Sequence, residues 1–224
     1  MKKKIIILVC AVVVLIGVFL AKTLWNAGEL KRIEPFSLYS SVAVPGFPGV
    51  EDIDIDRGAA VALGSFTDRR AAIAGQKRPT SGILAYDLAA PGARPVLLKT
   101  DFPGHLTPHG IHLYKGPDGG KLLFVINMGE DSHFFETTGV CTVEIFSYRD
   151  GKLHYLETIK SPELTTPNDI LGVGPRQFYV TIDHGWTSKW GKMLENYLQL
   201  LSRWHAAARQ EPGGCEAVMF ARFV

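Results

Sequence analysis

The sequence is poor in cysteine and lacks the short motifs of several common enzyme classes. Its three cysteines, Cys10, Cys141 and Cys215, do not show the close spacing of a zinc site. Outside the N-terminal apolar run only Cys141 and Cys215 could pair, and a disulfide and two free thiols both remain open. No Gly-x-Ser-x-Gly motif occurs, which disfavours a serine hydrolase of the nucleophile-elbow type.

An excess of charge of one sign is also missing. Lys and Arg total 24 against 22 Asp and Glu, a formal net charge of +2, and no basic stripe follows residue 32. Because proteins that bind nucleic acid usually carry a clustered basic surface, we expect no nucleic-acid partner. The hydrophobic content of 46% is that of an ordinary globular protein.

What the sequence does have is a long apolar run at its N-terminus. Three lysines precede uninterrupted apolar residues from Ile5 to Ala21, and Lys22 follows. The run nearly reaches the ~20 residues that cross a bilayer, and its basic flank fits a secretory signal. Cleavage before Lys22 would need a small residue where Phe19 stands. We therefore predict an uncleaved signal anchor over residues 1–25 with an extracytoplasmic domain over 26–224, and a secreted form is the alternative.

Short strands separated by turn signals dominate from about residue 50 to 183, with no amphipathic helical pattern. The predicted strands are Ala59–Leu63, Gly82–Leu88, Pro95–Lys99, Gly110–Tyr114, Leu122–Asn127, Thr142–Tyr148, Leu153–Lys160, Asp169–Val173 and Gln177–Ile182. A strand with a polar start recurs roughly every 45 to 55 residues, near Glu51, His109 and Asn168, as in the four-stranded blades of a β-propeller. We predict an all-β propeller in which these side chains converge on the central channel.

The stretch from about 188 to 210 breaks the strand pattern. Its apolar residues recur in steps of three to four, which predicts an amphipathic helix. They are Trp190, Leu194, Tyr197, Leu198, Leu201 and Trp204. Such an aromatic and cationic helix suits a membrane interface, and packing onto the β-domain is the alternative.

Hard oxygen donors stand at the edges of three short apolar strands. Glu51-Asp52 and Asn168-Asp169 are adjacent pairs, and His109 lies at the third edge. Carboxylate and amide oxygens suit Ca²⁺ better than Zn²⁺. Because neighbouring side chains of a strand face opposite ways, one pair could serve two ions. Turn formation is the competing explanation for each pair, and a hydrogen-bonded core histidine is the competing explanation for His109.

These segments resemble the serum paraoxonase/arylesterase family, six-bladed β-propellers of the calcium-dependent phosphotriesterase superfamily. The resemblance rests on Gly49–Ile53, Pro108–Ile111, Thr142–Phe146, Pro167–Ile170, Val173–Pro175 and Phe178–Tyr179. It implies that about the first three to four blades are present and that the chain is a fragment of a longer enzyme. It also implies that the N-terminal segment is retained and attaches to a membrane or lipid surface.

The resemblance further implies a hydrolase of aryl esters or lactones with two calcium ions. Glu51 and Asn168 resemble ligands of the family's catalytic calcium. Asp52, Asp169 and the backbone carbonyl of Ile111 resemble ligands of its structural calcium.

The same resemblance gives expectations for the reacting groups. His109 resembles the family's catalytic histidine, which would act as a general base. Met128 stands where the family has a second histidine, and Asp183 and His184 resemble residues at the mouth of the substrate pocket. A non-catalytic, membrane-anchored propeller that binds a lipid or protein partner is the alternative, and a propeller similar to strictosidine synthase is a third possibility.

Overall fold

The computed structural model describes residues 2–32, 34, 36–76, 78–129, 141–186, 188–198, 204–211 and 214–222. The chain divides into two compact units, Met1–Ala43 and Val44–Val224. The first contains helix α1, Lys2–Asn26, none of whose residues is buried. This helix is long and apolar enough to cross a membrane, and it lies near the N-terminus, where a signal sequence would also lie.

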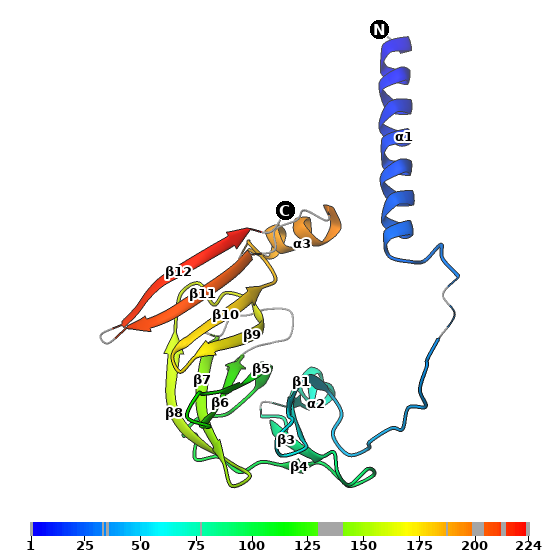
Figure 1. Ribbon diagram of the computed structural model, residues 1–224. Coiled ribbons are helices and arrows are strands. Elements are labelled where there is room, and N and C mark those ends of the chain that lie inside the picture. Colours follow the sequence, from blue (N-terminus) through cyan, green and yellow to red (C-terminus); the bar gives the residue numbers. More distant parts are fainter. Residues whose placement is uncertain are drawn as a thin grey trace. The chain divides into compact units, whose positions relative to one another are not determined.

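The second unit contains three four-stranded antiparallel sheets within the described residues (Figure 1). The first sheet runs in the order β1 Val50–Asp56, β2 Val61–Thr67, β3 Ser81–Asp87 and β4 Val96–Leu97. The second runs β5 Pro108–Lys115, β6 Lys121–Asn127, β7 Thr142–Arg149 and β8 Lys152–Lys160. The third runs β9 Pro167–Gly174, β10 Gln177–Ile182, β11 Trp204–Glu211 and β12 Gly214–Arg222. This arrangement is consistent with part of a propeller.

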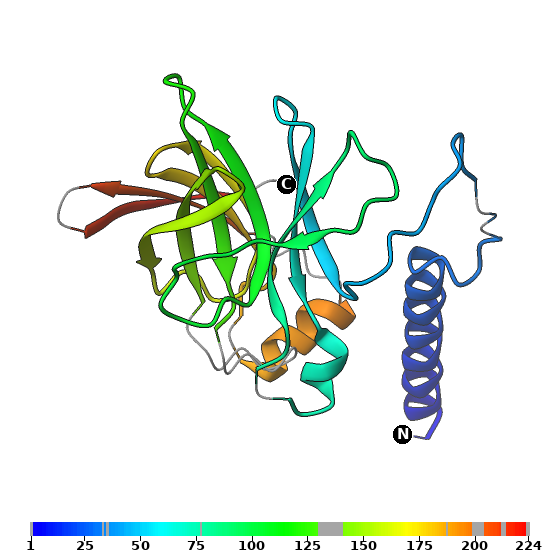
Figure 2. The same cartoon turned by 90° about the horizontal axis from the view of Figure 1, so that it is seen from below.

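The second sheet is buried on both faces and lies between the other two (Figure 2). Successive residues of β6 point to opposite faces. Phe124 and Ile126 belong to a cluster with residues of the third sheet, such as Phe178. Leu123 and Val125 belong to a cluster with residues of the first sheet. These four side chains are fully buried, so β6 contributes to both hydrophobic clusters.

Side chains of β1 link the first sheet to the second. Asp52 Oδ2 accepts a hydrogen bond of 2.7 Å from the backbone N–H of Ile111. Two residues further on, Asp54 Oδ2 accepts one of 2.6 Å from the N–H of Leu113. Alternate residues of a strand share a face, so the carboxylates of Asp52 and Asp54 accept hydrogen bonds from alternate N–H groups of β5.

The first strands of the second and third sheets, β5 and β9, also lie side by side. The N–H of Gly172 donates to His112 Nδ1 over 3.1 Å. At the start of β5, a Cβ atom added to Gly110 would lie 2.5 Å from the backbone oxygen of Asn168 and 2.7 Å from Cα of Asp169. Only glycine permits this approach, which brings the starts of β5 and β9 together.

The structure corrects two expectations about the elements. A short helix, α2 (Arg69–Ile73), interrupts the region predicted to hold strands only. The helix predicted over about 188–210 is α3, Lys189–Leu198, and it ends before the predicted boundary. Trp204–Glu211 forms β11, which pairs antiparallel with β10 from Gln177–Arg209 to Ile182–Trp204. Pairing satisfies the backbone groups along β10, and this requirement outweighs the helical spacing of a few apolar residues.

Candidate functional site

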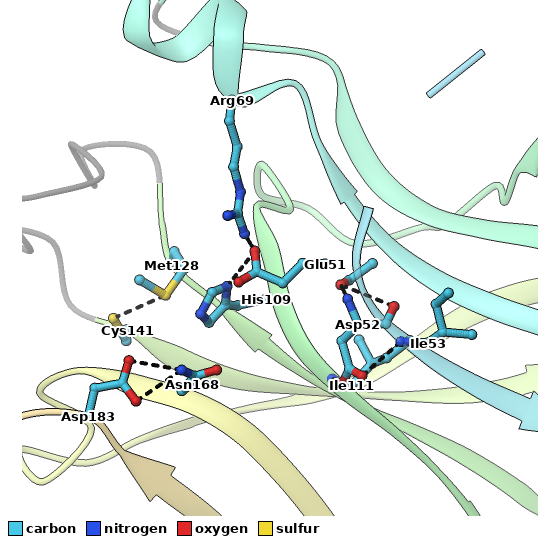
Figure 3. A network of polar contacts seen from close by, with 11 residues as sticks. Glu51, Asp52, Ile53, Arg69, His109, Ile111, Met128, Cys141, Asn168 and Asp183 are labelled. Atoms are coloured by element: carbon cyan, nitrogen blue, oxygen red, sulfur yellow. Dashed lines mark hydrogen bonds and ion pairs between the residues drawn. The ribbon is translucent and has the colours of Figure 1, made fainter. Parts of the chain in front are cut away.

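Glu51 of β1 and His109 of β5 form a carboxylate–imidazole pair where their strands begin (Figure 3). Glu51 Oε2 lies 3.0 Å from His109 Nδ1, and the side chains are 23% and 16% exposed. A carboxylate at neutral pH only accepts hydrogen bonds, so Nδ1 carries the hydrogen. In the neutral ring, Nε2 is then the basic nitrogen.

The surroundings of His109 favour its neutral form. Burial lowers the pKa of His109, and the positive charge of Arg69 lowers it further. The carboxylates of Asp183, Asp52 and Asp169 act in the opposite direction without reversing the shift. The imidazole is therefore available as a proton acceptor at neutral pH.

Arg69 is a third member of this group, and sequence reasoning missed it. Its Nη2 contacts the same oxygen of Glu51, Oε2, that His109 contacts. Arg69 is the first residue of α2, which begins directly after β2 because Asp68 Oδ1 accepts the N–H of Ala71 over 3.0 Å. An aspartate between a strand and a helix-forming run is an N-cap signal that the sequence offered.

Asn168 projects from the start of β9 with its amide group oriented by Asp183. Asn168 Nδ2 donates to both carboxylate oxygens of Asp183 at 2.9 Å. The amide oxygen therefore points away from Asp183 (Figure 3). The amide oxygen is a neutral ligand for a cation, and the backbone of Asn168 lies against β5, the strand that carries His109.

The residues expected around the structural calcium also come from neighbouring strands. Asp52 Oδ1 accepts the N–H of Ile53 and Oδ2 that of Ile111, both at 2.7 Å. Asp169 Oδ1 accepts the N–H of Ile170 at 2.7 Å. Asp52 and Asp169 thus repeat one local arrangement on β1 and β9.

The donor types fit calcium, but their number is small. Carboxylate, amide and carbonyl oxygens are calcium ligands, and six to eight are usual. Among the described residues, no three or more His, Cys, Asp or Glu side chains are grouped as a metal site. The oxygens of Glu51, Asn168, Asp52, Asp169 and Ile111 match the ion in kind and form at most part of a complete ligand shell.

The residues expected at the pocket follow two different strands, β6 and β10. Met128 follows β6, and its sulfur lies 3.9 Å from the thiol sulfur of Cys141, which is buried and free. His184 follows Asp183, and its Nδ1 lies 3.0 Å from Glu195 Oε2.

Glu195, on α3, contacts His184, and nothing in the sequence indicated this contact. Its side chain is buried, and Oε1 accepts the N–H groups of Gly185 and Trp186 at 3.0 and 3.2 Å. Together with the contact to His184, these bonds fix the segment that follows Asp183. A helical residue that reaches back nine to eleven positions leaves no sign in local spacing.

Comparison with known proteins identifies the family. Residues 73–206, more than half of the chain, match the Arylesterase family model. The chain belongs to the arylesterase family. It is 37% identical over 128 residues to serum paraoxonase/arylesterase 2 of Rattus norvegicus, covering 55% of this chain and 33% of the rat protein.

Other members of the arylesterase family show similar identities. Human serum paraoxonase/arylesterase 2 is 37% identical over 124 residues, 53% of this chain and 33% of the human protein. Human serum paraoxonase/lactonase 3 is 38% identical over 99 residues, 43% of this chain and 25% of that protein. The chain thus spans about a third of the length of the first two relatives.

Proposed function

We propose that this chain carries part of the active site of a calcium-dependent hydrolase of aryl esters or lactones. Its membership of the arylesterase family supports a hydrolase of the paraoxonase type. The observation that carries the proposal is the pair formed by Glu51 and His109, with Nδ1 and Oε2 3.0 Å apart at the start of two neighbouring strands. Asn168, on the first strand of the third sheet, adds an amide oxygen whose orientation is fixed by Asp183.

His109 is the general base in this proposal. Glu51 holds Nδ1, so Nε2 is the atom that takes a proton from the attacking water. The lowered pKa of His109 keeps the ring neutral and able to accept that proton at neutral pH. Glu51 then stabilises the positive charge that the ring gains.

Glu51 and Asn168 would hold the catalytic calcium ion, and Asp52, Asp169 and the carbonyl of Ile111 would hold the structural one. A calcium ion bound at the first place would polarise the ester carbonyl and stabilise the negative charge that develops on its oxygen. Asp183 orients the Asn168 amide for this task through its two hydrogen bonds.

We further propose that the substrate pocket includes Met128, Asp183 and His184, and that the protein works at a lipid surface. On α3 and just before it, Trp186, Trp190 and Leu194 are exposed near Lys189 and Lys192. Exposed aromatic residues beside lysines suit the interface of a bilayer. The apolar helix α1 would anchor the chain, with the second unit on the extracytoplasmic side.

The decisive test is calcium-dependent hydrolysis of phenyl acetate and of an aliphatic lactone by a protein that contains this chain together with the oxygen ligands that complete the calcium shell. We expect turnover that a calcium chelator abolishes and that Glu51→Gln removes. Hydrolysis that is unchanged in the chelator or in the variant contradicts the proposal.

A non-catalytic protein that binds a lipid or protein partner is the second candidate. The contact of Arg69 with Glu51 favours it, because a cationic side chain already neutralises the carboxylate. Under this alternative the chain binds vesicles but hydrolyses neither substrate at any calcium concentration.

A further inference from the structure

We propose that Arg69 is a built-in competitor of the divalent cation at Glu51. In the absence of the ion its guanidinium holds the carboxylate, and calcium must displace it to bind. The inference rests on the proposed role of Glu51 as a calcium ligand, and it concerns how tightly the site takes up the ion.

The contact involves a carboxylate oxygen that His109 also reaches. Arg69 Nη2 and His109 Nδ1 both reach Glu51 Oε2. The side chains of Arg69 and Glu51 are 30% and 23% exposed, so both charges lie in a partly dry environment. Electrostatic interactions are stronger there than on an open surface, where water and salt screen them.

The fold holds Arg69 over Glu51 by two local features. Asp68 caps α2, so Arg69 follows the last residue of β2 by only two positions. Gly49 lies two residues before Glu51, and a Cβ atom added there would be 2.4 Å from the Thr67 oxygen and 3.7 Å from Arg69 Cγ. The missing side chain at Gly49 therefore lets the end of β2 and the stem of Arg69 lie against the start of β1.

Two cations cannot share this oxygen without strong repulsion. Calcium needs direct contact with a carboxylate oxygen at 2.3–2.6 Å. A guanidinium cannot relieve the repulsion by losing its proton, because arginine stays charged at any physiological pH. A calcium ion bound at Oε2 would therefore drive Arg69 away from Glu51. The coupling is reciprocal, so the ion pair weakens calcium binding by the same factor as calcium weakens the ion pair.

The chain offers a matched control on the same helix. Arg70 is the next residue of α2, carries the same charge and is exposed. Replacing either arginine by glutamine changes the net charge by one unit. Only the change at residue 69 removes the cation that touches Glu51.

The test is a calorimetric titration of the full chain with Ca²⁺, with Tb³⁺ luminescence as a second readout. We expect Arg69→Gln to bind Ca²⁺ about tenfold or more tightly than the unchanged chain. Arg70→Gln should stay within about twofold of it. Arg69→Met, which keeps the aliphatic stem beside Gly49, should show the same gain and covers the case in which the glutamine variant fails to fold.

Two outcomes overturn the inference, and they are distinguishable. If Glu51→Gln abolishes Ca²⁺ binding while both Arg69 variants bind no more tightly than the unchanged chain, the calcium site stands and Arg69 does not compete. If no variant, including those at Arg69, binds Ca²⁺ or Tb³⁺ at millimolar concentration, the calcium site and the inference fail together.

Discussion

The two nitrogens of His109 have different neighbours, and this difference decides what the ring does. Nδ1 of His109 faces the Glu51 carboxylate. Burial of the ring and the nearby positive charge of Arg69 lower the pKa of His109 and so favour its neutral form. A histidine in such a place is a neutral acceptor through Nε2. Because Glu51 holds Nδ1, the ring takes up a further proton at Nε2.

Replacing His109 by alanine tests this role. We expect kcat/KM for phenyl acetate to fall about 10²- to 10⁴-fold, the range of a lost general base. The unfolding transition should show that the variant still folds. His154→Ala is the control, since His154 lies near Asp101 with 3.8 Å between Nδ1 and Oδ2 and belongs to another part of the molecule. Equal losses in both variants would contradict a catalytic role for His109.

The sequence located part of this residue group. Glu51, His109 and Asn168 were found because each begins a strand within a repeated pattern, and the structure brings the strands together. Arg69 and Glu195 reach the site from helices through side-chain contacts. Such contacts depend on how loops close, and residue spacing does not encode that.

At the scale of elements, three aspartates of β1 attach the first sheet to the second. Asp52 and Asp54 accept N–H groups of β5, and Asp56 ends the row as a fully buried carboxylate. Lys115 Nζ lies 2.9 Å from Asp56 Oδ1, and Lys121 contacts Oδ2. Asp56 therefore forms ion pairs with lysines, whereas Asp52 and Asp54 accept backbone N–H groups.

Asp56 gives a prediction about acid stability. Burial alone would raise the pKa of Asp56, but hydrogen bonds and charges from Lys121 and Lys115 outweigh it and lower the pKa to about 2. An unfolded aspartate titrates near 3.9. Because the folded pKa is the lower one, Asp56 stabilises the fold above about pH 4, and this contribution is lost as the pH falls to about 2.

The measurement is the urea midpoint of the unchanged chain and of Asp56→Asn between pH 2 and pH 7. We expect the variant to be less stable at pH 7 by about 1–3 kcal/mol, since both lysines are partly exposed. The difference should shrink towards pH 2. A difference that is constant over the whole pH range would contradict the assigned pKa.

The contact between β5 and β9 gives a second prediction at this scale. Gly110→Ala places a methyl group 2.5 Å from the Asn168 oxygen, so the two strands must separate. We expect the free energy of unfolding to fall by about 1–3 kcal/mol. The control is Gly58→Ala, whose added Cβ would meet only Asp56 Oδ1, at 3.6 Å. If Gly110→Ala is as stable as the control, β5 and β9 do not approach as described.

Many strands followed from the sequence, and the failure at residues 204–211 has a physical cause. The strand Gln177–Ile182 was predicted with its observed bounds because its β-branched and aromatic residues lie between turn signals. The strand Trp204–Glu211 was not, because Ala206–Ala208 is a helix-favouring run that becomes a strand only by pairing with β10. Local preference gives no information about a partner strand more than 20 residues away in the chain.

At the scale of the whole molecule, the two units differ in how much apolar surface they bury. Every described residue of α1 is outside any core, and its apolar side chains need a nonaqueous environment. The second unit holds two hydrophobic clusters of its own. The first unit extends beyond α1 to Ala43, and the boundary expected after residue 25 stays a prediction.

The fate of α1 can be measured on the full chain expressed in cells. We expect it to stay in the membrane pellet after an alkaline carbonate wash and to retain Ile5–Ala21 by mass spectrometry. Phe19→Ala is the matched variant, because it creates Ala-Leu-Ala before Lys22 and should increase cleavage there. Recovery of the unchanged chain in the medium, beginning at Lys22, would contradict the anchor.

The double duty of β6 has a consequence for how the second unit responds to damage. Leu123 and Val125 serve one cluster while Phe124 and Ile126 serve the other. A one-residue insertion in β6 would exchange these pairs and misplace aromatic and branched side chains on both sides at once. Both hydrophobic clusters therefore depend on the same strand. We expect them to unfold in one cooperative step rather than in succession.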